Sequence, residues 1–260
     1  MGCCNSSYIL PQVDLPELPP GIKHLTANSP QSLLDAVADV ATRSFAGTKT
    51  TPAEANLSWV FDPAGSGDDP CGPLVEDPTA ERLAYFKWMS TFMMAQTIKH
   101  GGCFALVDGD GDDAKVLACA LNFPPNDKKL HEVGMFQFMS LMKKAEGPMP
   151  KCVEGKRMKA LDKAMADSHK AHAKEPHWYV QVLAVAPEAQ SQGHGGKLMQ
   201  FITALGDKSG VPVYLECTGK NAEAFYVKNG FAMQARYPLT GGNDTLHVNG
   251  GLAAMVRPKK

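Results

Sequence analysis

Strong net charge, long apolar runs and a secretory leader are all missing from this chain of 260 residues. The formal net charge is -1, which gives no global electrostatic reason to expect nucleic acid as a partner. No apolar run approaches the roughly 18 residues that read as a membrane span, and the N-terminus lacks the charged-then-apolar layout of a secretory signal. We therefore expect a cytoplasmic protein, soluble or attached only to the cytosolic face of a membrane.

Paired cysteines are also lacking. The seven cysteines are scattered, odd in number and without the C-x-x-C pair that holds zinc or exchanges thiols. We expect reduced thiols and no bound metal. The run that begins at Asp108 starts like a calcium loop, but Asp113 and Cys119 stand where that loop needs Gly and Glu. That run is better explained as a turn.

The first residues fit an acylation pattern. Gly2 is placed as the acceptor for N-myristoylation, with Ser6 at the preferred small polar position. Cys3 and Cys4 then become candidates for palmitoylation, and two acyl chains anchor a protein stably where one does not. The alternative is a tail in which this spacing is accidental, and the sequence leaves both open.

A proline-rich stretch without a consistent period precedes residue 22 and predicts a flexible tail over residues 1–21. From there we expect a single domain over residues 22–258. Hydrophobic spacing predicts a strand at 22–25, a helix capped by Ser32, and a long helix over 80–99.

Two strand-like runs, 102–107 and 116–121, are joined by an Asp- and Gly-rich turn and predict a hairpin. Residues 124–176 predict a helical insert whose later part is basic. Such a basic face is usually solvated, and the alternative is a lid that recognises an acidic or phosphate-bearing group.

The chemistry concentrates after a run, 178–185, that is apolar at nearly every position, as in a central strand covered on both faces. A glycine-rich turn and an amphipathic helix follow. Free backbone N–H groups and the helix dipole at such a helix start favour an anion such as pyrophosphate. The residues of this turn are Gln190, Ser191, Gln192, Gly193, His194, Gly195 and Gly196.

Two other phosphate-binding motifs do not fit this turn. A Walker-type loop needs Ser or Thr after the Gly-Lys pair, and here Leu198 follows Lys197. The dinucleotide-binding fingerprint needs Gly or Ala where Leu198 stands. Nucleotide hydrolysis and dinucleotide binding are therefore disfavoured.

The run from Leu183 to Gly195 resembles instead the acetyl-CoA-binding motif of the GNAT superfamily, with its Q/R-x-x-G-x-G/A core. A second block, from Gly210 through Glu216 and Asn221 to Phe231, resembles the following strand and helix of that family, and among its members the puromycin-acetyltransferase-like proteins most of all. The resemblance implies an α+β GNAT fold. Its central mixed, mostly antiparallel sheet would have about six to seven strands, splayed after the fourth and flanked by helices, with final strands near 231–237 and 245–256.

The resemblance also implies a donor site for acetyl-CoA. The pantetheine arm would pair with the backbone of Leu183, Ala184 and Val185. The amides of residues 190–196 would hold the pyrophosphate, a backbone N–H near Ala184 would polarise the thioester carbonyl, and Asn221 would bind the pantetheine.

The catalytic groups are implied less completely. Tyr226 matches the tyrosine that lies near the CoA sulfur in the family and is the candidate acid. A carboxylate common early on the central strand is missing, because Tyr179 and Gln181 stand there; Glu216 is the substitute base, or else a structural acceptor. His177 is a weaker candidate base, and Cys217 is expected to be a packed cysteine without a partner for nucleophilic catalysis.

We therefore expect an acyltransferase that moves an acetyl group from acetyl-CoA to a primary amine of a small molecule. The alternatives are a protein acetyltransferase acting on lysine or N-terminal amines, and a non-catalytic acyl-CoA-binding module. The acceptor and the oligomeric state are beyond the sequence.

Overall fold

A seven-stranded sheet in the order β1-β2-β3-β4-β5-β9-β6 forms the centre of the computed structural model. The structure describes residues 15–61, 73–74, 76–109, 114–125, 155–241, 244–246 and 251–260. The strands are β1 (Ile22–Leu25), β2 (Cys103–Asp108), β3 (Lys115–Phe123), β4 (Trp178–Val185), β5 (Val213–Cys217), β6 (Ala232–Tyr237), β7 (Leu239–Gly241), β8 (Asp244–Leu246) and β9 (Leu252–Arg257). Strands β7 and β8 form a separate small sheet.

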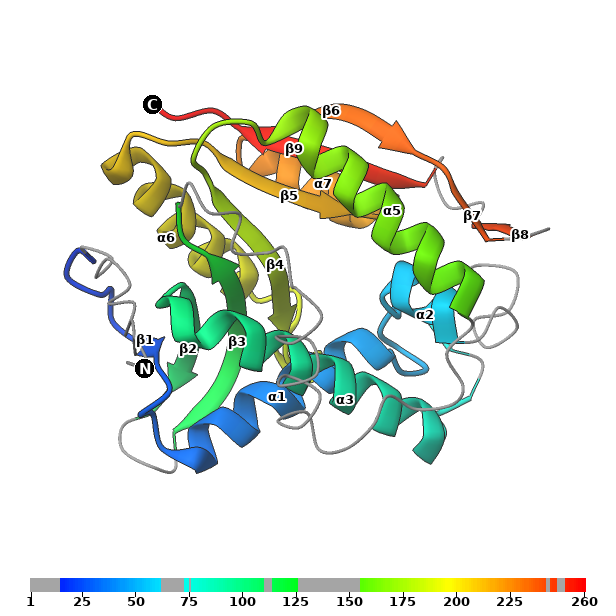
Figure 1. Cartoon of the computed structure of the whole chain (residues 1–260). Coiled ribbons are helices and arrows are strands. Elements are labelled where there is room, and N and C mark those ends of the chain that lie inside the picture. The colour runs from blue at the N-terminus through cyan, green and yellow to red at the C-terminus, as the bar shows by residue number, and fades with distance from the viewer. Residues whose placement is uncertain are drawn as a thin grey trace, which may run out of the picture.

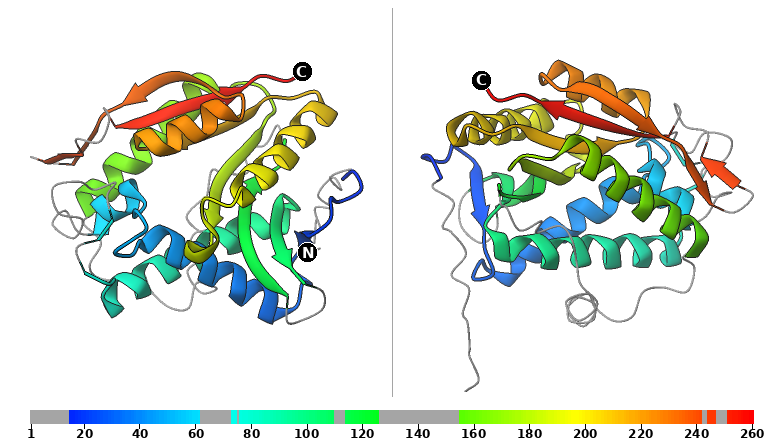
Figure 2. Two further views of the ribbon diagram at one scale, coloured as in Figure 1. Left: turned by 180° about the vertical axis from the view of Figure 1, so that it is seen from behind. Right: turned by 45° about the horizontal axis from the view of Figure 1, so that its top comes forward.

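Helices cover both faces of the central sheet (Figures 1 and 2). They are α1 (Gln31–Ala46), α2 (Ala55–Phe61), α3 (Ala80–Thr97), α5 (Gly155–His172), α6 (His194–Ser209) and α7 (Lys220–Lys228), with short turns η1 (Ile98–His100) and η2 (Pro187–Ala189). Helix α6 buries Leu198, Met199 and Ile202 against one face of the sheet. Helix α1 buries Val37 and Ala41 against the other face. Strand β4 is therefore covered on both sides, as its unbroken apolar run predicts.

Every neighbouring pair in the sheet is antiparallel except β4 and β5. That parallel pair is joined at only two positions, Trp178 with Val213 and Tyr179 with Tyr214. Beyond Tyr179 the two strands diverge, as Figure 1 shows. The predicted α+β fold, its strand number and the splay after the fourth strand are confirmed.

Several local predictions are confirmed and others are wrong. The strand at 22–25, the hairpin and the long helix are present. Ser32 does not cap α1, because Pro30 holds the N-cap position and its carbonyl already accepts from the amides of Leu33 and Leu34. Helix α2 was not expected. The last strand begins only at Leu252, since Asp244–Leu246 pairs with β7 instead.

Some predicted features lie outside the described residues. They include the acylation candidates Gly2, Cys3 and Cys4, most of the Asp-rich turn, and the first part of the helical insert up to residue 154. Leu15 and Leu18 follow the first undescribed segment and lie just before β1, and they pack against the main core cluster. Among the described helices, none combines the length and apolarity needed to cross a membrane.

Candidate active site

The turn between β4 and α6 presents its backbone N–H groups to open space. Ser191 has φ 62° and Gly193 has φ 86°, so the chain bends sharply into α6. Gly193 is the N-cap of α6 and offers no side chain to the helix amides. Within the described chain, the amides of residues 191–196 donate no hydrogen bond. These are the donors that an anion at a helix N-terminus would accept.

The glycines of this turn differ in their surroundings. A Cβ on Gly195 would stand 3.1 Å from Cγ2 of Val185, so α6 packs tightly onto the end of β4. Positions 193 and 196 have no atom within 4 Å of a Cβ site. The side of the turn that carries Gly193 and Gly196 is therefore open, and a phosphate group can approach the backbone there.

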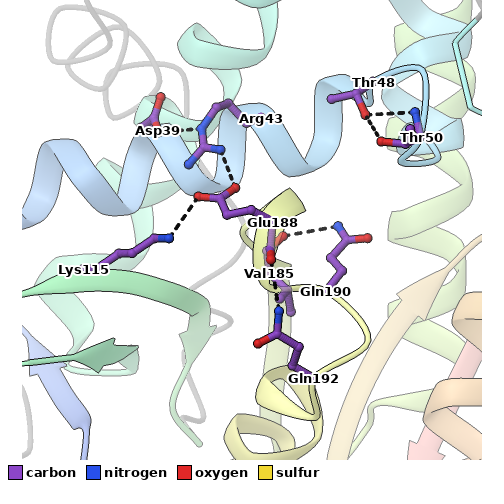
Figure 3. Close-up of polar contacts among 9 residues, drawn as sticks. All are labelled: Asp39, Arg43, Thr48, Thr50, Lys115, Val185, Glu188, Gln190 and Gln192. Carbon is purple, nitrogen blue, oxygen red and sulfur yellow. Dashed lines mark hydrogen bonds and ion pairs between the residues drawn. The ribbon is translucent and has the colours of Figure 1, made fainter.

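A set of polar contacts fixes the turn to the rest of the fold (Figure 3). The carboxylate of Glu188 accepts from Arg43 of α1 at 2.8 Å and lies 3.7 Å from Lys115 of β3. The hydrogen bond from Arg43 lowers the pKa of Glu188 to about 2. Gln192 Nε2 donates to the Glu188 carbonyl at 3.0 Å, and Gln190 Nε2 donates to the Val185 carbonyl at 3.3 Å. The turn is thus fixed to α1 through Arg43 and to β3 through Lys115.

A cavity of about 270 Å³ occupies the splay between β4 and β5. Its walls come from the segment joining α1 to α2, from α5 and from the two diverging strands, and most of them are apolar. Polar groups enter it from Glu54, Gln181, Gln190, Glu216 and Tyr226. The apolar walls include Phe45, Leu57, Met93, Leu161, Met165, Leu183 and Leu252. The cavity therefore adjoins the anion-binding turn through Gln190.

Glu216 has the properties expected of a base near neutral pH. Its side chain is 3% exposed. Tyr214 Oη donates to Glu216 Oε1 at 2.7 Å, and Tyr179 also donates to this carboxylate. Burial nevertheless raises the pKa of Glu216 to about 7, against the lowering effect of both hydroxyls. A buried carboxylate of this kind gains and loses a proton in the range where an amine must be deprotonated.

Tyr226 lies in the same cavity, from the middle of α7. Its ring packs between Phe225 and Phe231, with ring centroids 5.2 Å and 5.6 Å away. Burial raises the pKa of Tyr226 above its ordinary value, with Cys217 and Glu54 adding in the same direction. The phenol therefore keeps its proton, as a hydrogen-bond donor or acid must.

The structure alters the expected role of Ala184. Ala186 N–H donates to the Leu117 carbonyl of β3, and backbone groups alternate sides along a strand. The amide of Ala184 therefore also faces β3, where it contacts the thiol of Cys119. The amides that face the splay are those of Leu183 and Val185, so a thioester carbonyl in the splay would meet one of these.

Two further predicted residues lie away from the reacting position, and a third lies beside it as a packed cysteine. Asn221 is exposed in the first turn of α7 and does not line the cavity. His177 also lies outside the cavity, and its Nδ1–H donates to the Glu175 carbonyl at 2.7 Å. Cys217 does line the cavity, but burial raises the pKa of its thiol to about 12 and its Sγ contacts Met255 Sδ at 3.5 Å, as expected of a packed cysteine.

Sequence reasoning missed Glu54, a second carboxylate in the cavity. Its Oε2 accepts from the Leu57 amide at 2.6 Å, and burial raises its pKa despite Arg82 nearby. Asn56 Oδ1 accepts from Thr218 Oγ1 at 2.7 Å and so ties α2 to the end of β5. The sequence carries only a weak signal for this contact, because α2 has seven residues and no clear apolar period.

Of the described residues, no group of three or more His, Cys, Asp or Glu side chains is placed to hold a metal ion. The geometry of the turn suits an anionic ligand instead, with free amides, two open glycine positions and a helix N-terminus directed at the same point.

Comparisons with known proteins agree with this geometry. Residues 160–233 match the family model of the acetyltransferase (GNAT) domain, which covers β4, the turn, α6, β5 and α7. The chain is similar to the structure of histone acetyltransferase HPA2 and related acetyltransferase from Corynebacterium glutamicum, with 19% identity, a TM-score of 0.53 and coverage of 94% of this chain and 98% of that one.

Two insect structures are similar over comparable lengths. The arylalkylamine N-acetyltransferase 2 of Aedes aegypti shows 14% identity and a TM-score of 0.56, covering 92% of this chain and 99% of its own. The polyamine N-acetyltransferase of Drosophila melanogaster shows 13% identity and a TM-score of 0.50, covering 90% and 97%. At these identities the similarity shows a shared fold. The expected nearness to puromycin-acetyltransferase-like proteins stays a prediction. The chain has the GNAT fold, carries an acetyltransferase (GNAT) domain in residues 160–233, and is an acyltransferase.

Proposed function

We propose that this protein transfers the acetyl group of acetyl-CoA to the primary amine of a small molecule, by direct attack in a ternary complex. The observation that carries the proposal is one continuous site: the free amides of residues 191–196 adjoin a cavity that contains Glu216 and Tyr226. A pyrophosphate at the start of α6 would direct an extended pantetheine arm along the splay side of β4. The amides of Leu183 and Val185 would meet the thioester there.

The chemistry follows from the two titratable groups. The attacking amine must be neutral, and Glu216 as carboxylate accepts its proton. The N–C bond forms as the C–S bond breaks, and the leaving sulfur takes a proton or a hydrogen bond from Tyr226. The turnover rate should rise with pH through about 7, because Glu216 acts only after it has lost its own proton.

A small acceptor is favoured over a protein. Within the described residues the cavity holds about 270 Å³, and its lining includes Leu57 of α2 with Leu161 and Met165 of α5. Two of the similar structures are also N-acetyltransferases of small amines by name.

Calorimetry with acetyl-CoA and release of free thiol across a panel of amines test this proposal. We expect binding, and thiol release with at least one small amine. If acetyl-CoA does not bind, the proposal is wrong. If it binds but no amine or peptide releases thiol, the protein is a binding module, and if only peptides do, it is a protein acetyltransferase.

Site variants test the roles of the side chains. Tyr226→Phe and Glu216→Gln should each lower kcat by about 100-fold while leaving the Kd for acetyl-CoA within about threefold. Glu54→Gln separates the two carboxylates: a larger loss than in Glu216→Gln would make Glu54 the base. Glu81→Gln, an exposed carboxylate at the start of α3, is the control and should keep full activity.

A further inference from the structure

Glu216 belongs to a buried polar cluster that extends away from the reacting position. Tyr214 Oη gives its single proton to Glu216, so Ser168 Oγ must donate to Tyr214 Oη, 2.6 Å away. His169 Nδ1 lies 4.0 Å from Glu216 Oε1, with its side chain 8% exposed. Both Ser168 and His169 come from α5, which places the insert helix beside the candidate base.

The cluster continues from His169 to His177. The two imidazole rings have centroids 4.8 Å apart. His177 lines a second cavity, of about 240 Å³, formed by residues 171–175 with Pro212, Tyr214 and Val256. The first cavity contains Glu216 and the second contains His177, so the His169 ring lies between two separate spaces.

The tautomer of His177 suits proton transfer. Its Nδ1 lies 2.7 Å from the Glu175 carbonyl, which can only accept, so Nδ1 carries the hydrogen in the neutral ring. Nε2 then has the free lone pair and can take a proton from the direction of His169. Burial lowers the pKa of His177, which favours release of that proton to solvent.

The other neighbours of the carboxylate cannot carry its proton away. Of the described titratable side chains that face Glu216, Tyr179 comes from β4, Tyr214 from β5 and His169 from α5. Burial and the charge of Glu216 raise the pKa values of both tyrosines, so their hydroxyls stay protonated. An imidazole is the group that ordinarily gains and loses a proton near neutral pH.

We propose that His169 and His177 form a proton relay that returns Glu216 to its carboxylate form after each turnover. The relay rests on the function proposed above. The amine proton first forms the O–H bond of Glu216. That bond breaks as an N–H bond forms at His169 Nδ1, and the hydrogen on His169 Nε2 passes to His177 Nε2 and then to water in the second cavity. His169 is left with its hydrogen on Nδ1, and exchange with water returns it to Nε2 before the next turnover. The 4.0 Å gap between Glu216 and His169 exceeds a hydrogen bond by about 1 Å, so a small ring movement or one water completes the contact.

Turnover measurements on histidine variants test the relay. His169→Gln and His177→Gln should each lower kcat by about tenfold in weak buffer, with the Kd for acetyl-CoA unchanged. Added imidazole should restore the kcat of His177→Gln, because this side chain borders an open cavity. His172→Gln is the matched control: it lines the same cavity but bonds Tyr237 at 3.0 Å and should keep full activity. Wild-type kcat in both relay variants, or no rescue by imidazole, would overturn the proposal.

A second measurement does not depend on catalysis. The NMR titration of the Glu216 carboxyl carbon should move to higher pH in His169→Gln, because a neighbouring imidazolium favours the carboxylate. An unchanged midpoint would overturn the relay even in an active enzyme. If the wild-type protein releases no thiol with any amine, the proposed function fails. The titration then still shows whether the His169 side chain shifts the pKa of Glu216.

Discussion

Replacing Glu216 by Gln should change how the stability of this protein depends on pH. Gln has nearly the same shape and keeps an oxygen that can accept from Tyr214, but it cannot ionise. In the folded protein, burial raises the pKa of Glu216 from 4.5 to about 7. Because the folded value lies above the unfolded one, the contribution of Glu216 to stability is present in full below about pH 4.5 and is lost as the pH rises through about 7.

The size of the effect follows from the same values. A pKa raised from 4.5 to about 7 corresponds to about 3 kcal/mol of unfolding free energy. The side chain is only 3% exposed, so solvent screening removes little of this. Relative to the wild type, Glu216→Gln should therefore gain about 3 kcal/mol between pH 4.5 and pH 9, with most of the gain reached by pH 7.

Urea unfolding of both proteins at several pH values between 4.5 and 9 measures this difference. Titrations that the two proteins share cancel when the wild type is subtracted from the variant. Glu81→Gln, which removes one carboxylate at an exposed position, serves again as the control. A constant difference for Glu216→Gln as well would refute the argument that burial keeps this carboxyl protonated near neutral pH.

Four other substitutions give sharp expectations. Gly193→Ala should lower stability by about 1 to 2 kcal/mol in thermal unfolding, because its φ of 86° suits only glycine. Gly196→Ala should fold normally but weaken acetyl-CoA binding in calorimetry, since its Cβ would occupy the open side of the turn. Equal stability of the two would contradict this reading. Glu188→Gln should raise the Kd for acetyl-CoA by up to about fivefold through loss of the partly exposed pair with Arg43. An unchanged Kd would show that acetyl-CoA binding does not depend on this ion pair. Cys217→Ser should keep most of the kcat, because the raised pKa leaves the thiol unreactive; loss of activity in a folded variant would make this cysteine functional.

The donor half of the site was predictable from the sequence, because it is local. The strand 178–185, the turn and α6 follow one another in the chain, and the backbone itself supplies the binding groups. Glycine positions in the sequence therefore carry the signal directly. The splay was predictable only through the family resemblance, since nothing in the residues of β5 shows that its pairing with β4 stops after Tyr214.

The acceptor half was less predictable, because it is assembled from distant segments. Glu54 reaches the cavity from the connection between α1 and α2, and Leu161 and Met165 reach it from α5. Such contacts depend on how helices without a strong apolar period pack in the folded protein. The sequence named Glu216 but not the partners from α5 that surround it, and a basic helical face gave no hint of Ser168 and His169 on its buried side. The same limit applies to Ala184, because the side to which its backbone N–H points depends on strand register.

The short pairing between β4 and β5 leaves a strand edge in the interior of a sheet. Edges at the outside of a sheet invite other proteins to add a strand, and this is a common route to aggregation. An interior edge is protected by its own surroundings, because helices cover both faces and the second half of the sheet stands opposite. Only a single extended chain without bulky neighbours can reach it. The same opening that gives a ligand main-chain partners therefore also excludes the folded strands of other proteins.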